Sequence, residues 1–408
     1  MTSESAAGGT PAIPGGNAAE AGTPEEVAAP KQIDQSGETR SVRLESMRAL
    51  AASAVMVGHT FGQSIGYGAP ALATYPRRVV YGGGFGVFIF FCLSGYLLYR
   101  PFAVRDVGDG ATVNLARYAR NRVLRILPLY YAVVIVLIFL DPQLRHRLPL
   151  LKFATFTQTL FADTADLPNS LLWSVTVEIV FYATLPFLAW GIAVVARRSA
   201  LRAAIVILAL GAVSYVVWLT YGPHSLEHLS LGIHSFAANF VYFTPGMLLA
   251  LIRTSWAGVV PSWLPAILQR STLWLLASAG LMMIVFYRYD LDLLVMTAGF
   301  LAVGACVLPI RDGILLRALD WRPLAILGLA SYSLFVWHFP IVSALPAGSS
   351  WLHFAVLLPI GAVLSIAAAL VSYWAIESPF LRLRRRWSSA SAATGTSQGS
   401  NVEKRPAS

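Results

Sequence analysis

Two ionisable side chains in the first apolar stretch of the chain are spaced in a way that suits chemistry. Arg48 and His59 lie eleven residues apart in R-A-L-A-A-S-A-V-M-V-G-H. In a helix this is close to three turns, so both side chains project from nearly the same face, roughly 16 Å apart along the axis. If the helix crosses a bilayer, the guanidinium lies near one surface and the imidazole near the midplane. Ionisable groups at that depth are costly and usually face a protein interior or a wet cavity.

An imidazole at this depth is suited to accepting a proton from a hydroxyl group, because its unperturbed pKa lies near neutrality. Arg48 and His59 share a face, so one bound ligand could touch both. Each residue also has a purely structural interpretation. His59 could hydrogen-bond a neighbouring helix, and Arg48 could be a boundary cation that reaches the lipid headgroups.

A second basic pair occurs in Y-A-R-N-R-V-L-R-I-L-P, residues 118–128. Arg122 and Arg125 are three residues apart and therefore share a helix face. They could be ordinary charge at the cytoplasmic end of a span. Alternatively, they could form a site for phosphate groups, for which the rigid fork of arginine is better suited than lysine.

A carboxylate lies inside another apolar stretch, L-W-S-V-T-V-E-I-V-F-Y at 172–182. Glu178 should lie at roughly the depth that His59 reaches from the opposite side, so we expect that it could orient His59. A structural contact with an arginine or a tyrosine is the alternative. Tyr182 ends the same stretch, whereas Ser94 and His338 lie within others, and we expect all three to contact substrate or to support helix packing.

Composition excludes several classes of protein. Of the 408 residues, 56% are hydrophobic and 12% are charged, which is too apolar for an ordinary soluble domain. The net charge of +10 comes from arginines in loops rather than from a basic face with interleaved aromatics, so we expect no nucleic-acid partner. The sequence has no zinc-ligand spacing, and we expect no metal cofactor.

The apolar stretches predict an all-α integral membrane protein, a bundle of about ten transmembrane helices in a lipid bilayer. We place the spans at about 49–65, 79–98, 126–140, 171–195, 201–221, 236–252, 272–287, 291–310, 324–343 and 351–376. A further apolar segment, Leu148–Phe161, contains Lys152 and other polar residues, and we interpret it as re-entrant or interfacial.

Loop charges predict the orientation of this bundle. With both termini in the cytoplasm, most loop arginines fall inside, whereas the outer loops at 222–235 and 344–350 carry no Lys or Arg. Residues 1–40 and 388–408 are poor in apolar residues and predict disordered tails around a membrane domain at 41–387. Arginine and alanine are abundant, which favours a bacterial source and the cytoplasmic (inner) membrane.

At these residues the chain resembles the membrane acyltransferase-3 family. The matching motifs run in family order across 43–383: R-x10-H at Arg48–His59, F-F-C-L-S-G-Y at 90–96, R-x-x-R-I-L-P at 122–128, W-S-V-T-V-E at 173–178, W-H at 337–338 and I-E-S-P-F at 376–380. Two motifs depart from the family pattern. The first reads L-E-S-M-R, where an Asp-Gly pair commonly precedes the arginine, and the acidic pair after W-S is a single glutamate here.

The resemblance implies a ten-span enzyme that moves an acyl group from cytoplasmic acyl-CoA, with acetyl-CoA expected, onto a hydroxyl of a sugar, glycan, lipid or secondary metabolite such as a macrolide. It implies His59 and Arg48 as the essential pair, with Arg122, Arg125 and Glu178 as supports. We expect Arg48, Arg122 and Arg125 to bind the phosphates of CoA, His59 to act as general base, and Glu178 to assist it.

Two other functions are compatible with the sequence. One is a proton-coupled transporter of a small molecule, with His59 and Glu178 as a proton relay. The other is an acyl-group conduit that feeds a separate enzyme. The identity of the acceptor, the length of the acyl chain, the side of the membrane on which the acceptor is modified, the choice between direct transfer and a covalent acyl-histidine, and the oligomeric state are left open by the sequence.

Overall fold

A computed structural model describes residues 41–108, 110, 112–140, 150–161, 171–221, 234–288, 291–384 and 387. The predicted tails at 1–40 and 388–408 lie outside these residues. Within the described ranges all regular structure is helical, and the only β-pairing is an isolated bridge between Arg270 and Arg311. The predicted all-helical class is confirmed.

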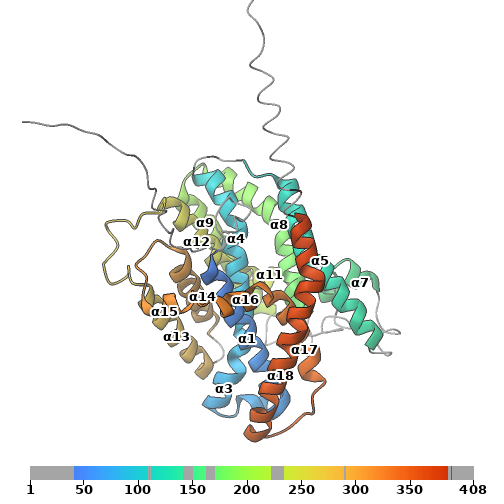
Figure 1. Cartoon of the computed structure of the whole chain (residues 1–408). Coiled ribbons are helices and arrows are strands. Elements are labelled where there is room, and N and C mark those ends of the chain that lie inside the picture. The colour runs from blue at the N-terminus through green and yellow to red at the C-terminus, as the bar shows by residue number, and fades with distance from the viewer. Residues whose placement is uncertain are drawn as a thin grey trace, which may run out of the picture. The chain divides into compact units, whose positions relative to one another are not determined.

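The longer helices follow the apolar stretches of the sequence (Figure 1). They are α1 (Val42–Ile65), α4 (Gly86–Val107), α5 (Leu115–Leu140), α8 (Leu172–Ala196), α9 (Ala200–Tyr221), α12 (Thr244–Ser255), α13 (Ser271–Arg288), α14 (Asp292–Val307), α17 (Ser331–Ser343) and α18 (Trp351–Ser372). Shorter elements join them: α2 (Ala69–Leu72), α3 (Tyr75–Tyr81), η1 (Gly82–Phe85), α7 (Leu150–Ala154), η2 (Gln158–Leu160), α11 (Phe236–Asn239), η3 (Phe240–Tyr242), α15 (Ile314–Ala318), α16 (Arg322–Leu329) and η4 (Tyr373–Glu377).

Six of the described helical stretches are long and apolar enough to cross a membrane. They are Tyr75–Val107, Leu115–Leu140, Leu172–Ala196, Ala200–Tyr221, Ser271–Arg288 and Trp351–Arg384. Two bent pairs qualify as one span each: Phe236–Tyr242 with Thr244–Ser255, bent by 42°, and Arg322–Leu329 with Ser331–Ser343, bent by 72°. The described residues therefore support a multi-pass membrane protein with six to eight candidate spans. The count of ten and the cytoplasmic placement of both termini stay predictions.

Helix α1, a predicted span outside that set, lies among other helices rather than at the edge of the bundle. It packs against η1, α4, α16, α17 and α18. Ala49 and Ala52 are fully buried and Val55 nearly so, which lets the neighbouring helices approach closely. The ionisable residues of α1 are thereby placed against protein rather than lipid, which is where such residues are tolerated.

Two glycines in the segment 82–96 permit close approaches between helices. A Cβ atom at Gly83 would overlap the backbone carbonyl of Ala54 in α1. A Cβ atom at Gly95 would overlap the backbone carbonyl of Phe243, which precedes α12. Segment 82–96 therefore lies tightly between α1 and α12.

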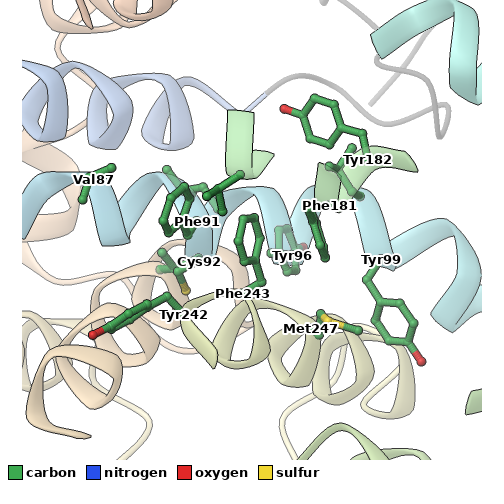
Figure 2. Packing of buried hydrophobic residues seen from close by; sticks show 14 of the residues in the cluster. Val87, Phe91, Cys92, Tyr96, Tyr99, Phe181, Tyr182, Tyr242, Phe243 and Met247 are labelled. Atoms are coloured by element: carbon green, nitrogen blue, oxygen red, sulfur yellow. The ribbon is translucent and has the colours of Figure 1, made fainter. Parts of the chain in front are cut away.

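An aromatic stack forms the core between α4, α8 and α12 (Figure 2). The rings of Phe91 and Phe243 are stacked with centroids 4.7 Å apart, and those of Phe181 and Phe243 with centroids 4.1 Å apart. All three side chains are almost fully buried. Stacked rings of this size give large apolar burial and restrict how the helices can shift, so they fix α4 relative to α8.

The segment Leu148–Phe161, predicted to be re-entrant or interfacial, contains α7 and η2 in its described part. Neither element is long enough to cross a bilayer. Tyr130 and Tyr131 of α5 donate hydrogen bonds to the backbone carbonyls of Phe153 (3.2 Å) and Ala154 (2.9 Å). These bonds attach the segment to α5.

Candidate active site

Two histidines from distant parts of the sequence form a pair at the centre of the bundle. His59 of α1 and His338 of α17 have ring centroids 5.3 Å apart, and His59 Nδ1 lies 3.3 Å from His338 Nε2. His338 is fully buried, whereas His59 retains some exposed surface. The ring of Phe339 packs edge-on against His59, with centroids 5.2 Å apart.

Backbone carbonyls determine the tautomer of each ring. His59 Nδ1 lies 2.9 Å from the oxygen of Val55, and His338 Nδ1 lies 3.0 Å from the oxygen of Leu334. A carbonyl oxygen can only accept, so both Nδ1 atoms are assigned the hydrogen. His338 Nε2 is then an acceptor for the same Nδ1–H of His59. The remaining nitrogen of His59, Nε2, carries a lone pair and is the atom that can take up a proton.

Arg48 lies on α1 about three turns before His59, near the start of the helix. Its Nε donates to Ser331 Oγ at 3.1 Å, and its guanidinium lies over the ring of Phe90, 5.5 Å from the ring centroid. Glu45, one turn earlier on α1, lies 4.0 Å from the same Nε. Arg48 is therefore oriented by α4 and by the first residue of α17, with a carboxylate beside it.

Glu178 of α8 is also held by hydrogen bonds. Ser94 of α4 donates to its Oε1, and Tyr182 donates to the same oxygen at 2.5 Å. The predicted pair of Glu178 with His59 is not formed among the described residues, because the imidazole turns to His338. Ser94 and Tyr182 thus hold the carboxylate, and their contact with substrate stays a prediction.

Arg122 and Arg125 lie on α5, facing the same group of helices. The guanidinium of Arg122 is 5.8 Å from the ring centroid of Tyr182, and its buried Nε has no hydrogen-bond partner among the described residues. Arg125 interacts electrostatically with Glu45, Glu377 and Glu178.

Glu377 completes this group of charges. It ends the π-helix η4, and Ser333 of α17 donates to its Oε1 at 2.5 Å. Its carboxylate interacts electrostatically with Arg125 and Arg48. Single π-helical turns inside α-helices often occur at functional sites, because they redirect one side chain. Glu377 thus offsets part of the charge of these two arginines.

The charged residues therefore form one compensated cluster, which we call the arginine–glutamate cluster. It contains three arginines and three glutamates, namely Arg48, Arg122, Arg125, Glu45, Glu178 and Glu377. The sequence predicted a positively charged phosphate site made by the three arginines. Equal numbers of carboxylates explain how so much charge is tolerated between helices, since buried charges must be paired or hydrogen-bonded.

A small cavity of about 30 Å³ lies against this cluster. Its polar walls are Arg48, Glu178, Ser174 and Tyr332, and its apolar walls are Val87, Phe90, Phe91, Val175 and Phe335. Such a volume has room for about two water molecules, well below the range of about 300–1,000 Å³ that is usual for ligand sites. The lining combines two charged side chains with several aromatic rings.

His59 does not line this cavity. Phe335 does, and its ring lies 6.0 Å from that of His338, which in turn contacts His59. One aromatic layer thus separates the cavity from the histidine pair. His59 as a residue keeps a little exposed surface, although it does not line this cavity.

The structure joins some predicted site residues and separates others. Arg48, Glu178, Arg122 and Arg125 come together, whereas His59 and His338 form a second group. Sequence reasoning missed Glu45, whose signal was its position three residues before Arg48, where the two share a helix face. It also missed Ser331, which no local pattern marks, and the contact of Phe90 with Arg48. Among the described residues, no three His, Cys, Asp or Glu side chains are grouped as metal ligands.

Comparison with known proteins places the whole helical region in one family. The model of the acyltransferase-3 acyltransferase domain matches residues 41–376. A Bacillus subtilis (strain 168) protein named "Putative peptidoglycan O-acetyltransferase YrhL" is 28% identical over 291 residues, covering 64% of this chain and 44% of that protein. The chain thus spans less than half the length of that relative. No solved structure is significantly similar to the chain.

The family match includes every residue of the arginine–glutamate cluster except Glu377, which follows its last position, and both histidines of the pair. It also covers most of the chain. We conclude that the chain belongs to the acyltransferase-3 family and that residues 41–376 are its acyltransferase domain.

Proposed function

We propose that this protein is a membrane O-acyltransferase that moves an acyl group, with acetyl expected, from acyl-CoA onto a hydroxyl group. The observation that carries the proposal is the pairing of His59 with His338 one aromatic layer away from a cavity walled by Arg48 and Glu178. Together these groups offer a base for a hydroxyl and a polar pocket for a donor, in a chain of an acyltransferase family.

The donor would approach through the arginine–glutamate cluster. The cavity has room for only about two water molecules, so donor binding would have to widen it. Its aromatic walls would then lie against the pantetheine arm, and the thioester would lie beyond them at His59. Two buried groups on α5 support this assignment. Arg122 Nε and both amide atoms of Asn121 have no hydrogen-bond partner among the described residues. Leaving such groups unpaired costs about 1–3 kcal/mol each, which a polar ligand would recover.

The arginines are unequal candidates for the phosphates. Arg125 already interacts with three carboxylates, whereas Arg122 has an aromatic ring beside it and an unpaired Nε. We therefore assign Arg122 the larger share of any phosphate contact. Arg48, which lines the cavity, would contact the pantetheine arm of the donor.

Transfer would use the lone pair at His59 Nε2. The acceptor O–H gives its proton to Nε2 while the acceptor oxygen bonds to the carbonyl carbon of the thioester. The C–S bond then breaks, and the CoA thiolate takes the proton back from the imidazolium. General-base assistance of this kind typically supplies about 10²–10⁴-fold in rate, and orientation of the two substrates contributes the rest.

The acceptor would approach His59 by a route other than this cavity, because His59 does not line it. A glycan hydroxyl is the acceptor class that we favour, because the matched relative is named for acetylation of peptidoglycan. A small sugar or a secondary metabolite such as a macrolide offers the same hydroxyl chemistry. We place the protein in the bacterial cytoplasmic membrane, with the donor on the cytoplasmic side.

The proposal is tested with the full chain in lipid vesicles and [14C]acetyl-CoA, in the presence of peptidoglycan oligosaccharides or free sugars. We expect labelled acceptor and free CoA thiol in equal amounts. Solute movement that follows a proton gradient without CoA consumption would contradict the proposal in favour of transport. Thiol release without labelled acceptor would contradict it in favour of an acyl-group conduit.

A further inference from the structure

We infer that His338 is a positioning residue for acyl transfer, which holds His59 in its reactive tautomer and orientation. This inference rests on the proposed function. It adds a role for a histidine 279 residues away from His59, whose Nε2 meets the Nδ1 of His59 at 3.3 Å. His338 acts through His59 and does not touch the substrate.

The direction of this hydrogen bond follows from the surroundings of His338. Its own Nδ1–H is occupied by the carbonyl of Leu334 at 3.0 Å, so Nε2 is left as an acceptor that faces His59. The ring is fully buried and packed against Phe335, so it has little freedom to turn away. A buried acceptor aimed at one donor is a device that selects a single tautomer.

The second acceptor for the Nδ1–H of His59 is the carbonyl of Val55, which cannot fix the orientation of the ring alone. The carbonyl of Val55 belongs to the same helix as His59 and constrains the ring only locally. His338 comes from α17 and therefore fixes the imidazole relative to the helix that carries Phe335, a wall of the cavity. Together the two acceptors share the Nδ1–H and direct Nε2 away from both.

A neutral acceptor also suits the charge that develops during transfer. When His59 takes up a proton, its Nδ1–H becomes a stronger donor, and hydrogen bonds from a charged donor are roughly twice as strong as neutral ones. Among the described residues, no carboxylate is hydrogen-bonded to either ring. The other titratable group nearby, Tyr67, donates only to the backbone oxygen of His59. His338 is therefore the side chain that would stabilise the transient imidazolium.

If His338 were purely structural, it would contribute only packing and burial. Its substitution would then lower Tm or change kcat and KM together. A positioning histidine gives a different result. Loss of its acceptor should lower kcat and leave the KM of donor and acceptor unchanged. A side chain that restores an acceptor at the same place should restore kcat.

Two variants separate these roles. His338→Leu removes the acceptor at similar volume, and His338→Gln supplies an amide oxygen that can accept from Nδ1–H. We expect His338→Leu to lower kcat by about 10- to 100-fold, the size typical when the partner of a functional histidine is lost. Both KM values should stay within about two-fold, and His338→Gln should recover most of kcat. If the leucine variant does not fold, His338→Met provides a second apolar replacement.

A double variant tests whether His338 acts through His59 rather than through the fold. His59→Ala combined with His338→Leu should be no slower than His59→Ala alone, because a positioning residue has nothing left to orient. Wild-type kcat in His338→Leu would overturn the inference, as would equal losses in the leucine and glutamine variants with reduced Tm. If His59→Ala itself keeps full activity, the proposed function fails as well, so the two failures are distinguishable.

Discussion

Arg48 donates from its Nε to Ser331 Oγ, 3.1 Å away, at the point where α16 and α17 bend by 72°. The same helix, α17, carries His338, which contacts His59 further along α1. Two side-chain contacts therefore connect α1 to α17, one at the charged end of the site and one at the imidazole. Beyond the 72° bend, α17 runs beside α1 from Ser331 to His338.

The first prediction concerns Arg48→Lys. Lysine keeps the charge but loses the planar guanidinium that donates to Ser331 and lies over Phe90. Loss of a charged hydrogen bond costs about 1.5–3 kcal/mol, which is on the order of ten- to a hundred-fold in KM for acyl-CoA. Steady-state kinetics with varied donor measure this, with Ser331→Ala as a control that removes only the hydrogen bond. An unchanged donor KM would contradict the role of Arg48.

The second prediction concerns Glu178→Gln, which keeps an acceptor for Ser94 and Tyr182 but removes the charge. Since Glu178 is hydrogen-bonded to these residues and not to His59, we expect lower stability and a higher donor KM, with kcat close to the wild type. The stability loss follows because Arg125 loses one compensating carboxylate. Thermal melts in detergent and donor kinetics test this. A collapse of kcat with unchanged KM and Tm would restore the predicted Glu178–His59 relation.

The third prediction uses two neighbouring glycines as a matched pair. Gly83→Ala places a Cβ against the carbonyl of Ala54, whereas a Cβ at Gly84 meets nothing within 4 Å. Overpacking of this kind typically costs about 1–3 kcal/mol. We expect Gly83→Ala to lower Tm and Gly84→Ala to leave it unchanged or slightly higher. Equal melting temperatures for the two variants would contradict the close approach of η1 to α1.

The fourth prediction is a pH dependence at the loop before α15. Hydrogen bonds from the guanidinium of Arg43 lower the pKa of Asp312 below its ordinary value. A carboxylate with a lowered folded-state pKa stabilises the fold above its unfolded pKa of about 3.9, and that contribution is lost as the pH falls through the lower folded value. The effect is small, because Asp312 is 45% exposed and exposed ion pairs contribute little.

Melting curves of wild type and Asp312→Asn measure this contribution. The wild type should be more stable than the variant near neutral pH, and the difference should shrink as the pH is lowered below about 4. A difference that grows in acid would have the wrong sign.

Much of the fold could be predicted because apolar stretches long enough to span a bilayer are local features. The ten predicted spans each fall on a described helix or bent pair, although the structure supports only six to eight of them as membrane-crossing by length and composition. The bend between α16 and α17 could not be predicted, since no proline lies at residue 330 and the direction of the turn depends on tertiary packing. The same holds for the π-helical turn that aims Glu377.

The site was only partly predictable for a related reason. Spacing within one helix places Arg48 and His59 on a face, and Arg122 with Arg125 on another, because these relations depend on helix geometry alone. The partner of His59 depends on which helix is adjacent. Glu178 and His338 were both at suitable depths, and only the packing of α17 against α1 selects His338. The compensation of the arginines by Glu45 and Glu377 likewise required the assembled bundle.

The central claim is that His59 Nε2 is the base for acyl transfer. The most direct measurement is the rate of [14C]acetyl transfer from acetyl-CoA to the acceptor by His59→Ala in vesicles, with His353→Ala as the matched control. His353 is a histidine on α18 that hydrogen-bonds the carbonyl of Pro346 and takes no part in the site. We expect His59→Ala to lose about 10²–10⁴-fold in rate at unchanged expression and Tm, and His353→Ala to retain wild-type activity. Wild-type transfer by a folded His59→Ala would contradict the mechanism.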